Sequence, residues 1–147
     1  MTVPIEPKAA LIKVLRDNAA LAALLGTHGG AASVFDQSLP AGAGLPAVLV
    51  EQTSGVPESA MGADPGLVDS TWTVKIVANA SASQSASQRV KAVARALKQA
   101  IVRYSGAVVV ADGTVTIQLV QQIGERDFEW PDALLSSRVV DLRVAFA

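Results

Sequence analysis

The 147-residue sequence contains no cysteine and only one histidine. The missing thiols exclude disulfide bonds, thiolate metal sites and cysteine nucleophiles, and they fit a cytosolic origin. Aromatic residues make up 4% of the chain and charged residues 17%, whereas hydrophobic residues make up 50%. A disordered chain is excluded because such chains are poor in apolar residues and rich in charge.

The sequence also lacks the long apolar run, about 18 residues, that a transmembrane helix requires. Its first residues, Met1–Lys8, hold two prolines and a glutamate in place of a basic start and an apolar block, so we expect no signal peptide. The net charge of −1 argues against a dedicated nucleic-acid binder. With half of its residues hydrophobic and few charged, the chain is expected to have an apolar surface that is partly buried against copies of itself or another partner.

An amphipathic helix is predicted for Lys8–Leu25. Pro7 suits its start, because the fixed φ of proline is helical and its missing N–H would have no helical partner there. Apolar residues recur at helical spacing, and Val14, Leu21 and Leu25 widen the apolar arc beyond a core stripe of about 100°. This excess apolar surface predicts a contact outside the core.

Both predicted helices carry sequence signals at their ends. Gly26 follows the first helix and is expected to be its left-handed C-cap. The second helix begins at Ser81 or Ser85, each followed three residues later by glutamine as in a capping box. It runs to about Val102 and has one apolar face.

Strands are predicted where apolar and polar residues alternate or where short apolar runs lie between turn residues. The predicted segments are Ser33–Asp36, Ala47–Ser54, Leu67–Ala78, Ala107–Ala111, Thr114–Ile123 and Ser136–Phe146. Asp112-Gly113 predicts a hairpin turn. Trp72 is expected in the core, and Leu119 and Ile123 are expected on the inward face. Two long loops are predicted, Gly55–Gly66 and Gly124–Leu135.

This pattern predicts an α+β fold in a single domain, residues 1–147. The sheet is expected to be mainly antiparallel, with about four to five strands and two helices packed on one face. The predicted order is α-β-β-β-α-β-β.

Catalytic chemistry finds little support in the sequence. His28 is the only candidate base for a hydrolytic triad, and it lies in a glycine-rich loop without a Gly-x-Ser-x-Gly motif. The acidic residues lack calcium-loop spacing, and no histidine pair is available for zinc. Nothing favours a pair of catalytic carboxylates. We interpret the chain as a non-enzyme that needs neither metal nor cofactor.

Charges of opposite sign are segregated along the chain. No acidic residue lies between Asp69 and Asp112, and on a helical wheel Lys91, Arg95 and Lys98 share one flank of the second helix. Acidic residues gather in the two long loops, one of which also contains aromatic residues. Separated opposite charges favour head-to-tail contacts between copies.

The order of these short patterns resembles the tail completion, or tail terminator, proteins of bacteriophages with long non-contractile tails. The resemblance covers about residues 5–146. It depends on Pro7–Leu15, Leu24–Gly26, Ser33–Asp36, Leu45–Val50, Ser54–Pro57, Thr73–Ile76 and Val93–Leu97. The Leu45-Pro46 pair and the Gly55-Val56-Pro57 stretch are the closest local matches.

The resemblance implies a structural virion protein that assembles in the bacterial host cytoplasm. It implies a ring, expected to be a hexamer, that caps the head-proximal end of the tail tube, ends tube polymerisation and joins the tail to the head connector. The expected partners are further copies of the chain, the tail tube protein and the connector or stopper protein, with the tape measure protein as another candidate. No membrane or specific nucleic-acid binding is expected, although DNA could pass through the ring.

Two sets of residues are expected at contacts. The candidates for the subunit interface are Val14, Leu21, Lys91, Arg95 and Lys98. The candidates for partner-contact loops are Glu58, Met61, Asp64, Glu125, Asp127, Phe128, Glu129 and Trp130. The alternative interpretations are another neck or head-completion protein, a tail tube subunit, or a small hydrolase-like domain that uses His28.

Overall fold

Three helices and nine strands form the described part of the chain. The computed structural model describes residues 7–53, 58–59, 68–127 and 134–147. The helices are α1 (Lys8–Asp17), α2 (Ala19–Ala22) and α3 (Ala86–Ile101). The strands are β1 (Thr27–His28), β2 (Ala31–Ala32), β3 (Val34–Asp36), β4 (Ala47–Gln52), β5 (Glu58–Ser59), β6 (Val68–Ala78), β7 (Gly106–Val110), β8 (Gly113–Asp127) and β9 (Ser136–Phe146).

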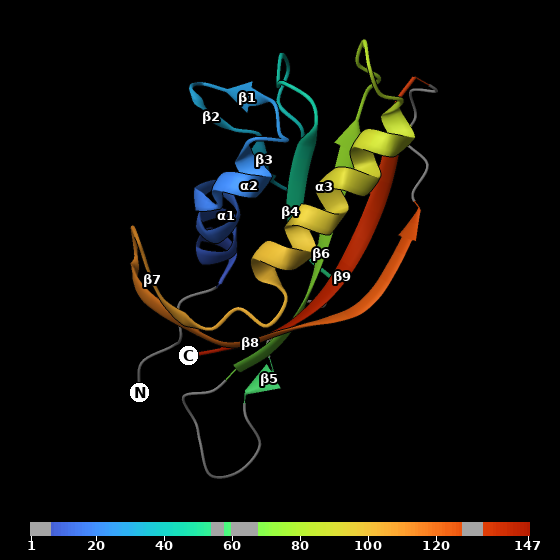
Figure 1. Ribbon diagram of the computed structural model, residues 1–147. Coiled ribbons are helices and arrows are strands. Elements are labelled where there is room, and N and C mark those ends of the chain that lie inside the picture. Colours follow the sequence, from blue (N-terminus) through green and yellow to red (C-terminus); the bar gives the residue numbers. More distant parts are fainter. Residues whose placement is uncertain (1–6, 54–57, 60–67, 128–133) are drawn as a thin grey trace.

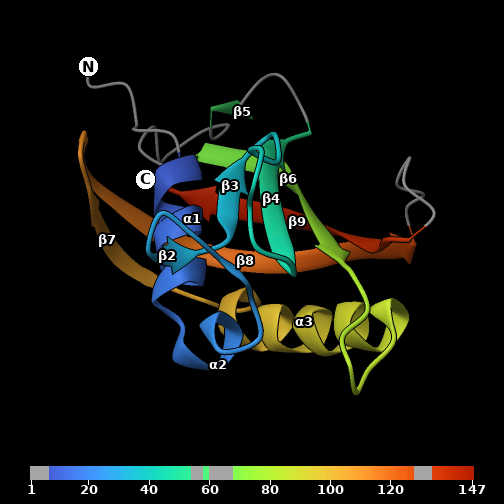
Figure 2. The same ribbon diagram turned by 90° about the horizontal axis from the view of Figure 1, so that it is seen from above.

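The main sheet is a curled layer with the strand order β3-β4-β6-β9-β8-β7, and β5 pairs with one end of β6 (Figure 1). Strands β1 and β2 form a separate small hairpin. Helix α3 packs on β6 and β9, while α1 contacts β3, β4 and β7. Seen from above, α1 lies between the two edge strands β3 and β7 (Figure 2).

The α+β class and the placement of the helices on one face agree with the sequence, but the strand details differ. The expected four to five strands become seven in the main sheet, and β3 pairs with β4 in parallel while the other pairs are antiparallel. The short strands β1, β2 and β5 have two residues each, too few to give an alternating pattern.

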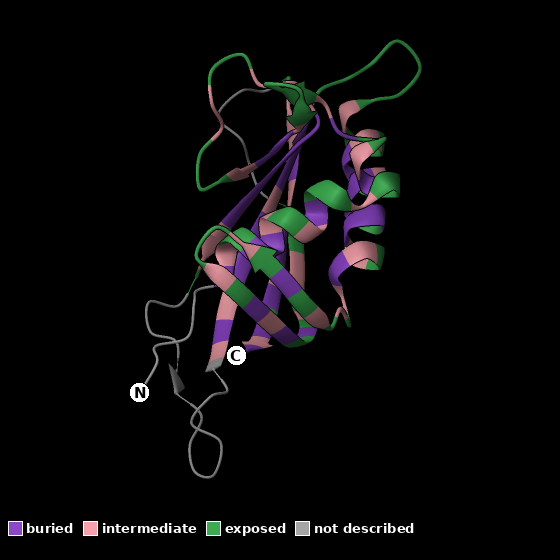
Figure 3. Cartoon of the chain, turned by 90° about the vertical axis from the view of Figure 1, so that its left-hand side faces the viewer, coloured by how far each residue is buried: buried purple, intermediate pink, exposed green. Residues whose placement is uncertain are grey.

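One apolar core lies between the helices and the inward face of the sheet. It contains Trp72, which is fully buried as expected, and Val140, Leu142, Val144 and Phe146 of β9. Purple marks the buried sides of the helices and strands in Figure 3, and green marks the outward sides of the helices.

The long first helix predicted from the sequence is wrong, because the chain breaks at Asn18. This residue has an extended ψ of 113°, and its side chain accepts a hydrogen bond from the Leu21 amide to begin α2. The break changes the helix direction, so Leu21 and Leu25 are 0% and 8% exposed in the core. The apolar face predicted for the first helix was too wide because the prediction placed the residues of two helices on one helical wheel.

Gly26 has a different role from the expected left-handed C-cap. A Cβ atom at this position would lie 2.2 Å from the backbone carbon of Gly44. The two glycines let the segments approach closely, and the Gly26 amide donates to the Pro46 carbonyl. The glycine is thus required by tertiary contact.

The start of α3 confirms the second of the two predicted caps. Ser85 accepts from the Gln88 amide, and the Gln88 side chain accepts from the Ser85 amide in return. This capping box satisfies two helix-end amides that would otherwise lack partners.

Strand β8 departs from the predicted alternation. Register shifts between Ile117 and Leu119 and between Gln122 and Gly124 mark two irregularities in its pairing with β9. A bulge places two residues opposite one and reverses the phase of the side chains that follow. As a result Val120 is buried, whereas Leu119 and Ile123 are 49% and 52% exposed, in contrast to their predicted inward positions.

The predicted loop Gly124–Leu135 is also partly wrong, since β8 continues to Asp127. Apolar residues are rare at the end of β8, so no alternating pattern could extend the predicted strand beyond Ile123. Most of the other predicted loop, Gly55–Gly66, lies outside the described residues, apart from the two residues of β5.

Candidate assembly surfaces

Helix α1 connects the two edge strands of the sheet through its basic side chains. Lys13 donates from Nζ to the carbonyl of Val109 in β7 at 3.0 Å, and Arg16 donates from Nη2 to the carbonyl of Val34 in β3 at 2.6 Å. Lysine and arginine at a strand edge occupy acceptors that another strand could otherwise pair with. Both edges are thus partly protected within the chain.

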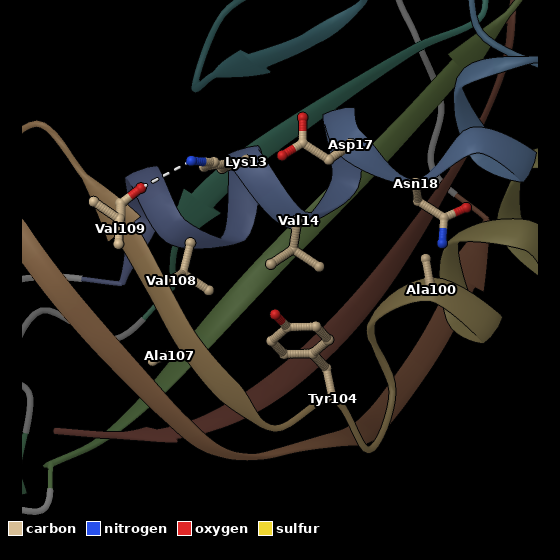
Figure 4. A pocket seen from close by; sticks show the side chains of 9 residues that line it. All are labelled: Lys13, Val14, Asp17, Asn18, Ala100, Tyr104, Ala107, Val108 and Val109. Carbon is tan, nitrogen blue, oxygen red and sulfur yellow. Dashed lines mark hydrogen bonds between the residues drawn. The ribbon is translucent and has the colours of Figure 1, made fainter.

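A groove divided into two parts by Lys13 runs between α1 and β7. The parts have volumes of about 380 and 500 Å³. Figure 4 shows the first, with Val14 and Tyr104 facing the space and Lys13 bonded to Val109. Val109 is 64% exposed, so its apolar side chain lies open to solvent at the groove. Asp17 lines both parts and has no recorded ion pair with the described residues.

A second surface lies along one flank of α3. Lys91 and Arg95 are exposed, and neither has an ion pair or hydrogen bond recorded in the described part of the chain. Lys98, on the same flank, instead reaches β8, where its Nζ lies 2.9 Å from Glu125 Oε2. Lys98 therefore differs from Lys91 and Arg95, the other two residues of this flank expected at an interface, because it already has a carboxylate partner.

Glu125 is the centre of a small ion cluster. Arg138 lies 3.4 Å from Glu125 Oε1 and 3.2 Å from Asp127 Oδ1, in addition to the Lys98 contact. The hydrogen bond from Lys98 lowers the pKa of the Glu125 carboxyl despite the opposing effect of burial. These basic and acidic residues, separate in the sequence, are therefore joined within one chain by the fold.

The far end of β8 is an open strand edge. Strand β7 pairs with β8 only as far as Ile117, while residues 118–127 pair with β9 alone. On the open side, and among the described residues, the Arg103 amide donates a backbone hydrogen bond to the Val120 carbonyl at 2.8 Å. The exposed side chains of Leu119 and Ile123 lie on this stretch.

The outward face of the sheet is largely occupied by cross-strand polar pairs. Lys75 lies 2.9 Å from Glu51, and Asp69 pairs with Arg143. Asp141 pairs with Arg126 and accepts from Thr73. Because these charges have partners in the same chain, this face offers fewer free groups than the α3 flank.

The other predicted contact residues divide into two groups. Val14 is partly buried and lines the groove, whereas the side chain of Leu21 is fully enclosed by the core of the subunit and is not proposed further as a contact residue. Glu58 belongs to β5, but its side chain lies outside the described part. Also outside it lie Met61, Asp64, Phe128, Glu129 and Trp130.

His28 lies in β1 as an exposed residue, with its ring 5.6 Å from that of Phe35 in an edge-to-face contact. No group of three or more potential metal ligands occurs among the described residues. Within the same residues, no helix has both the length and the apolar character needed to cross a membrane.

Sequence reasoning missed four residues of these surfaces. Asp17 and Asp112 are exposed acids without a recorded ion pair in the described chain, and Leu119 and Ile123 are exposed apolar residues. Asp112 could have been noticed from its place in the predicted hairpin turn, whereas Asp17 lies in the middle of the predicted first helix and reaches a helix end only because the chain breaks at Asn18. The apolar pair had no such signal, because the bulges depend on pairing with β9.

Comparison with known proteins gives a family for this arrangement. No curated protein matches the chain. A solved chain from the "Virion of native gene transfer agent (GTA) particle" has a similar fold, with a TM-score of 0.68 and 21% identity over 95% of this chain and 92% of that one. The family model described as "Tail completion protein gp17" matches residues 9–147.

This match is to a family of structural components of the phage tail, which are constituents of the virion. The chain belongs to the tail completion protein gp17 family, as the resemblance in the sequence predicted.

Proposed function

We propose that the chain forms a ring of identical subunits, expected to be a hexamer, at the head-proximal end of the tail tube. The ring ends tube polymerisation and offers a surface to the head connector. Further copies of the chain, the tail tube protein and the connector or stopper protein are its partners, with the tape measure protein as another candidate. Assembly takes place in the host cytoplasm, and DNA can pass through the opening of the ring.

One observation carries this proposal beyond family membership. The exposed basic flank of α3 and the groove between α1 and β7 are different surfaces, since Lys91 and Arg95 lie in the middle of α3, whereas Ala100 at the end of α3 lines the groove. A contact between two unlike surfaces of one chain is heterologous, so it repeats head to tail and closes into a ring when the rotation permits.

The first test is the assembly state of the purified chain. Native mass spectrometry and negative-stain electron microscopy are expected to show closed rings of one size. Long filaments would support the alternative of a tail tube subunit, and a persistent monomer would contradict the ring.

The second test is tube termination. Rings added to polymerising tail tube protein are expected to shorten the tubes and to be found at one tube end. Tubes of unchanged length, with rings bound instead to the connector alone, would favour the alternative of another neck component.

Charge reversal tests the α3 flank directly. Because Lys98 already contacts Glu125 within the subunit, we choose Lys91→Glu/Arg95→Glu and leave Lys98 unchanged. This variant is expected to weaken the ring while leaving thermal unfolding nearly unchanged, because both side chains are exposed. Ser83→Glu, an exposed change in the segment before the same helix, is the control and should assemble normally.

The hydrolase alternative has its own test. Since His28 is the only histidine, His28→Ala removes the only candidate imidazole base. Full retention of assembly and tube termination is expected, and loss of either with an intact fold would reopen the alternative.

A further inference from the structure

We propose that residues 1–6 of one copy bind in the groove between α1 and β7 of the neighbouring copy. The inference rests on the proposed ring and names the segment that links one subunit to the next. These residues, Met-Thr-Val-Pro-Ile-Glu, are called the leading segment, and they lie outside the described part of the chain. The groove that receives them is formed by described residues.

The walls of the groove are mainly apolar and come from α1, from β7 and from the chain at the end of α3. The larger apolar side chains are those of Ile12, Val14, Tyr104, Val108, Val109 and Val110. Val14 and Tyr104 face the same space (Figure 4), and Val109 is 64% exposed. Each part of the groove exceeds about 300 Å³, the lower range of pockets that hold a ligand. Covering these exposed apolar walls is favourable, because it removes them from water.

The groove favours an occupant that binds through its side chains. Lys13 already donates to the Val109 carbonyl, which hinders the addition of another strand at this point of the β7 edge. Charge does not select the occupant either, because Asp17 lines the groove together with the cations Lys13 and Arg16. A segment in the polyproline II conformation needs no hydrogen bonds from a strand edge, and such segments dock in grooves lined by aromatic residues. Tyr104 supplies the aromatic ring here.

The sequence of the leading segment has the chemistry that this groove requires. Val3, Pro4 and Ile5 are three consecutive apolar residues, and Pro4 and Pro7 form a Pro-x-x-Pro pattern. Proline has a fixed φ, and Val3 and Glu6 each precede a proline, which restricts their backbone to extended conformations. A segment restrained in this way loses less conformational freedom when it binds.

The position of Pro7 favours a neighbouring copy over the same chain. Pro7 has helical φ and ψ of −78° and −1°, and its carbonyl accepts from the Leu11 amide, so it is fixed at the start of α1. The groove follows α1 from there toward Asp17, which is the direction the chain itself takes. The leading segment of the same copy would have to double back at Glu6, whose backbone Pro7 restricts to extended conformations. Six extended residues reach about 20 Å, which is enough to cross to an adjacent subunit.

Crosslinking between two differently tagged chains tests which copy supplies the segment, because the chain has no cysteine of its own. One chain carries Ile5→Cys and the other carries Val109→Cys, and the two are co-expressed and treated with a short bis-maleimide. A covalent dimer that carries both tags is expected. In the control, Leu24→Cys replaces Val109→Cys, since Leu24 is 40% exposed but lies outside the groove, and it should give at most a trace of this dimer.

Deletion of residues 2–6 tests whether the segment is required for assembly. The shortened chain is expected to raise the dissociation constant of the ring by about tenfold or more, because a few apolar anchors carry most of the energy of a contact. Its thermal unfolding by circular dichroism should stay nearly unchanged, since α1 begins only at Lys8. Val3→Ser/Ile5→Ser keeps the length and both prolines and should weaken the ring similarly, whereas the control Thr2→Ser should assemble normally.

A peptide provides a readout that does not depend on ring formation. A fluorescently labelled peptide of the sequence Met-Thr-Val-Pro-Ile-Glu-Pro is expected to bind the shortened chain, as measured by fluorescence anisotropy. Val109→Glu in the shortened chain should weaken this binding by about tenfold, because a charge replaces an apolar wall of the groove. Ser83→Glu adds the same charge at an exposed position away from the groove and should leave the binding unchanged.

The outcomes separate this contact from the ring itself. Intact rings after the deletion, with no mixed-tag dimer above the control, would overturn the contact and leave the proposed ring standing. Crosslinks that form only within a single chain carrying Ile5→Cys/Val109→Cys would assign the groove to the leading segment of the same copy and would also overturn the contact. A full-length chain that forms no ring and does not shorten tubes would overturn both proposals.

Discussion

Lys98 of α3 and Glu125 of β8 are 27 residues apart in the sequence, yet Nζ and Oε2 lie 2.9 Å apart. Their contact fixes the helix to the part of β8 that β7 does not reach. Both side chains are partly exposed, at 33% and 22%. The pair therefore has a role within the subunit, which distinguishes Lys98 from Lys91 and Arg95 on the same flank.

Glu125→Gln is expected to lower the free energy of unfolding by about 1 kcal/mol near neutral pH, because Lys98 and Arg138 lose a partly buried carboxylate. The pKa of Glu125 is lowered in the folded chain, so its contribution is present above the ordinary carboxyl range and is lost as the pH falls through the lowered pKa. The difference between variant and wild type should therefore shrink as the pH decreases.

Urea unfolding between about pH 7 and pH 3 measures this difference. Asp127→Asn is the matched control, since Asp127 contacts the same Arg138 but is 83% exposed, and its effect should be much smaller. A constant loss for Glu125→Gln at every pH would show that the ion pair is not its cause.

Asn18→Ala is expected to destabilise the chain by about 1 kcal/mol, because the Leu21 amide loses its acceptor at the start of α2. The change also favours a continuous helix, which would rotate Leu21 out of the core. Thermal unfolding by circular dichroism measures the loss. Ser83→Ala changes an exposed side chain that makes no hydrogen bond within the described part of the chain, so it should leave the midpoint unchanged.

Gly26→Ala and Gly29→Ala make the same chemical change, but each is expected to lower the free energy of unfolding for a different reason. At Gly26 the new methyl group meets the Gly44 backbone, so a loss of about 3 kcal/mol is expected from overpacking. At Gly29 there is open space, but φ is +61°, so a loss of about 1 kcal/mol is expected from backbone strain. Equal losses in urea unfolding would contradict the close approach of Gly26 and Gly44.

Ile123→Lys is expected to reduce ring formation with little change in unfolding midpoint, because the side chain is 52% exposed beside an open strand edge. Light scattering measures assembly and circular dichroism measures folding. Leu24→Lys, at 40% exposure, should lower neither property appreciably. A large loss of stability in Ile123→Lys would instead assign this residue to the core.

The elements that depend on local pattern were predicted well. Strand β9 spans Ser136–Phe146 as predicted, and the capping box at Ser85 lies where the sequence indicated. Such features follow from alternation, helical periodicity and hydrogen bonds over three residues. The basic flank of α3 was also visible, since the positions of Lys91 and Arg95 depend only on helical geometry.

The features that depend on distant partners were predicted wrongly or missed. Leu119 and Ile123 face outward because β8 adjusts its register to β9, and Leu21 is buried because Asn18 redirects the helix. Lys98 is paired because the fold brings Glu125 to it. By itself the sequence thus determined the α+β class, the family and most helix and strand positions. Tertiary structure decided which apolar and charged side chains remained free, because exposure and pairing depend on contacts between segments far apart in the chain.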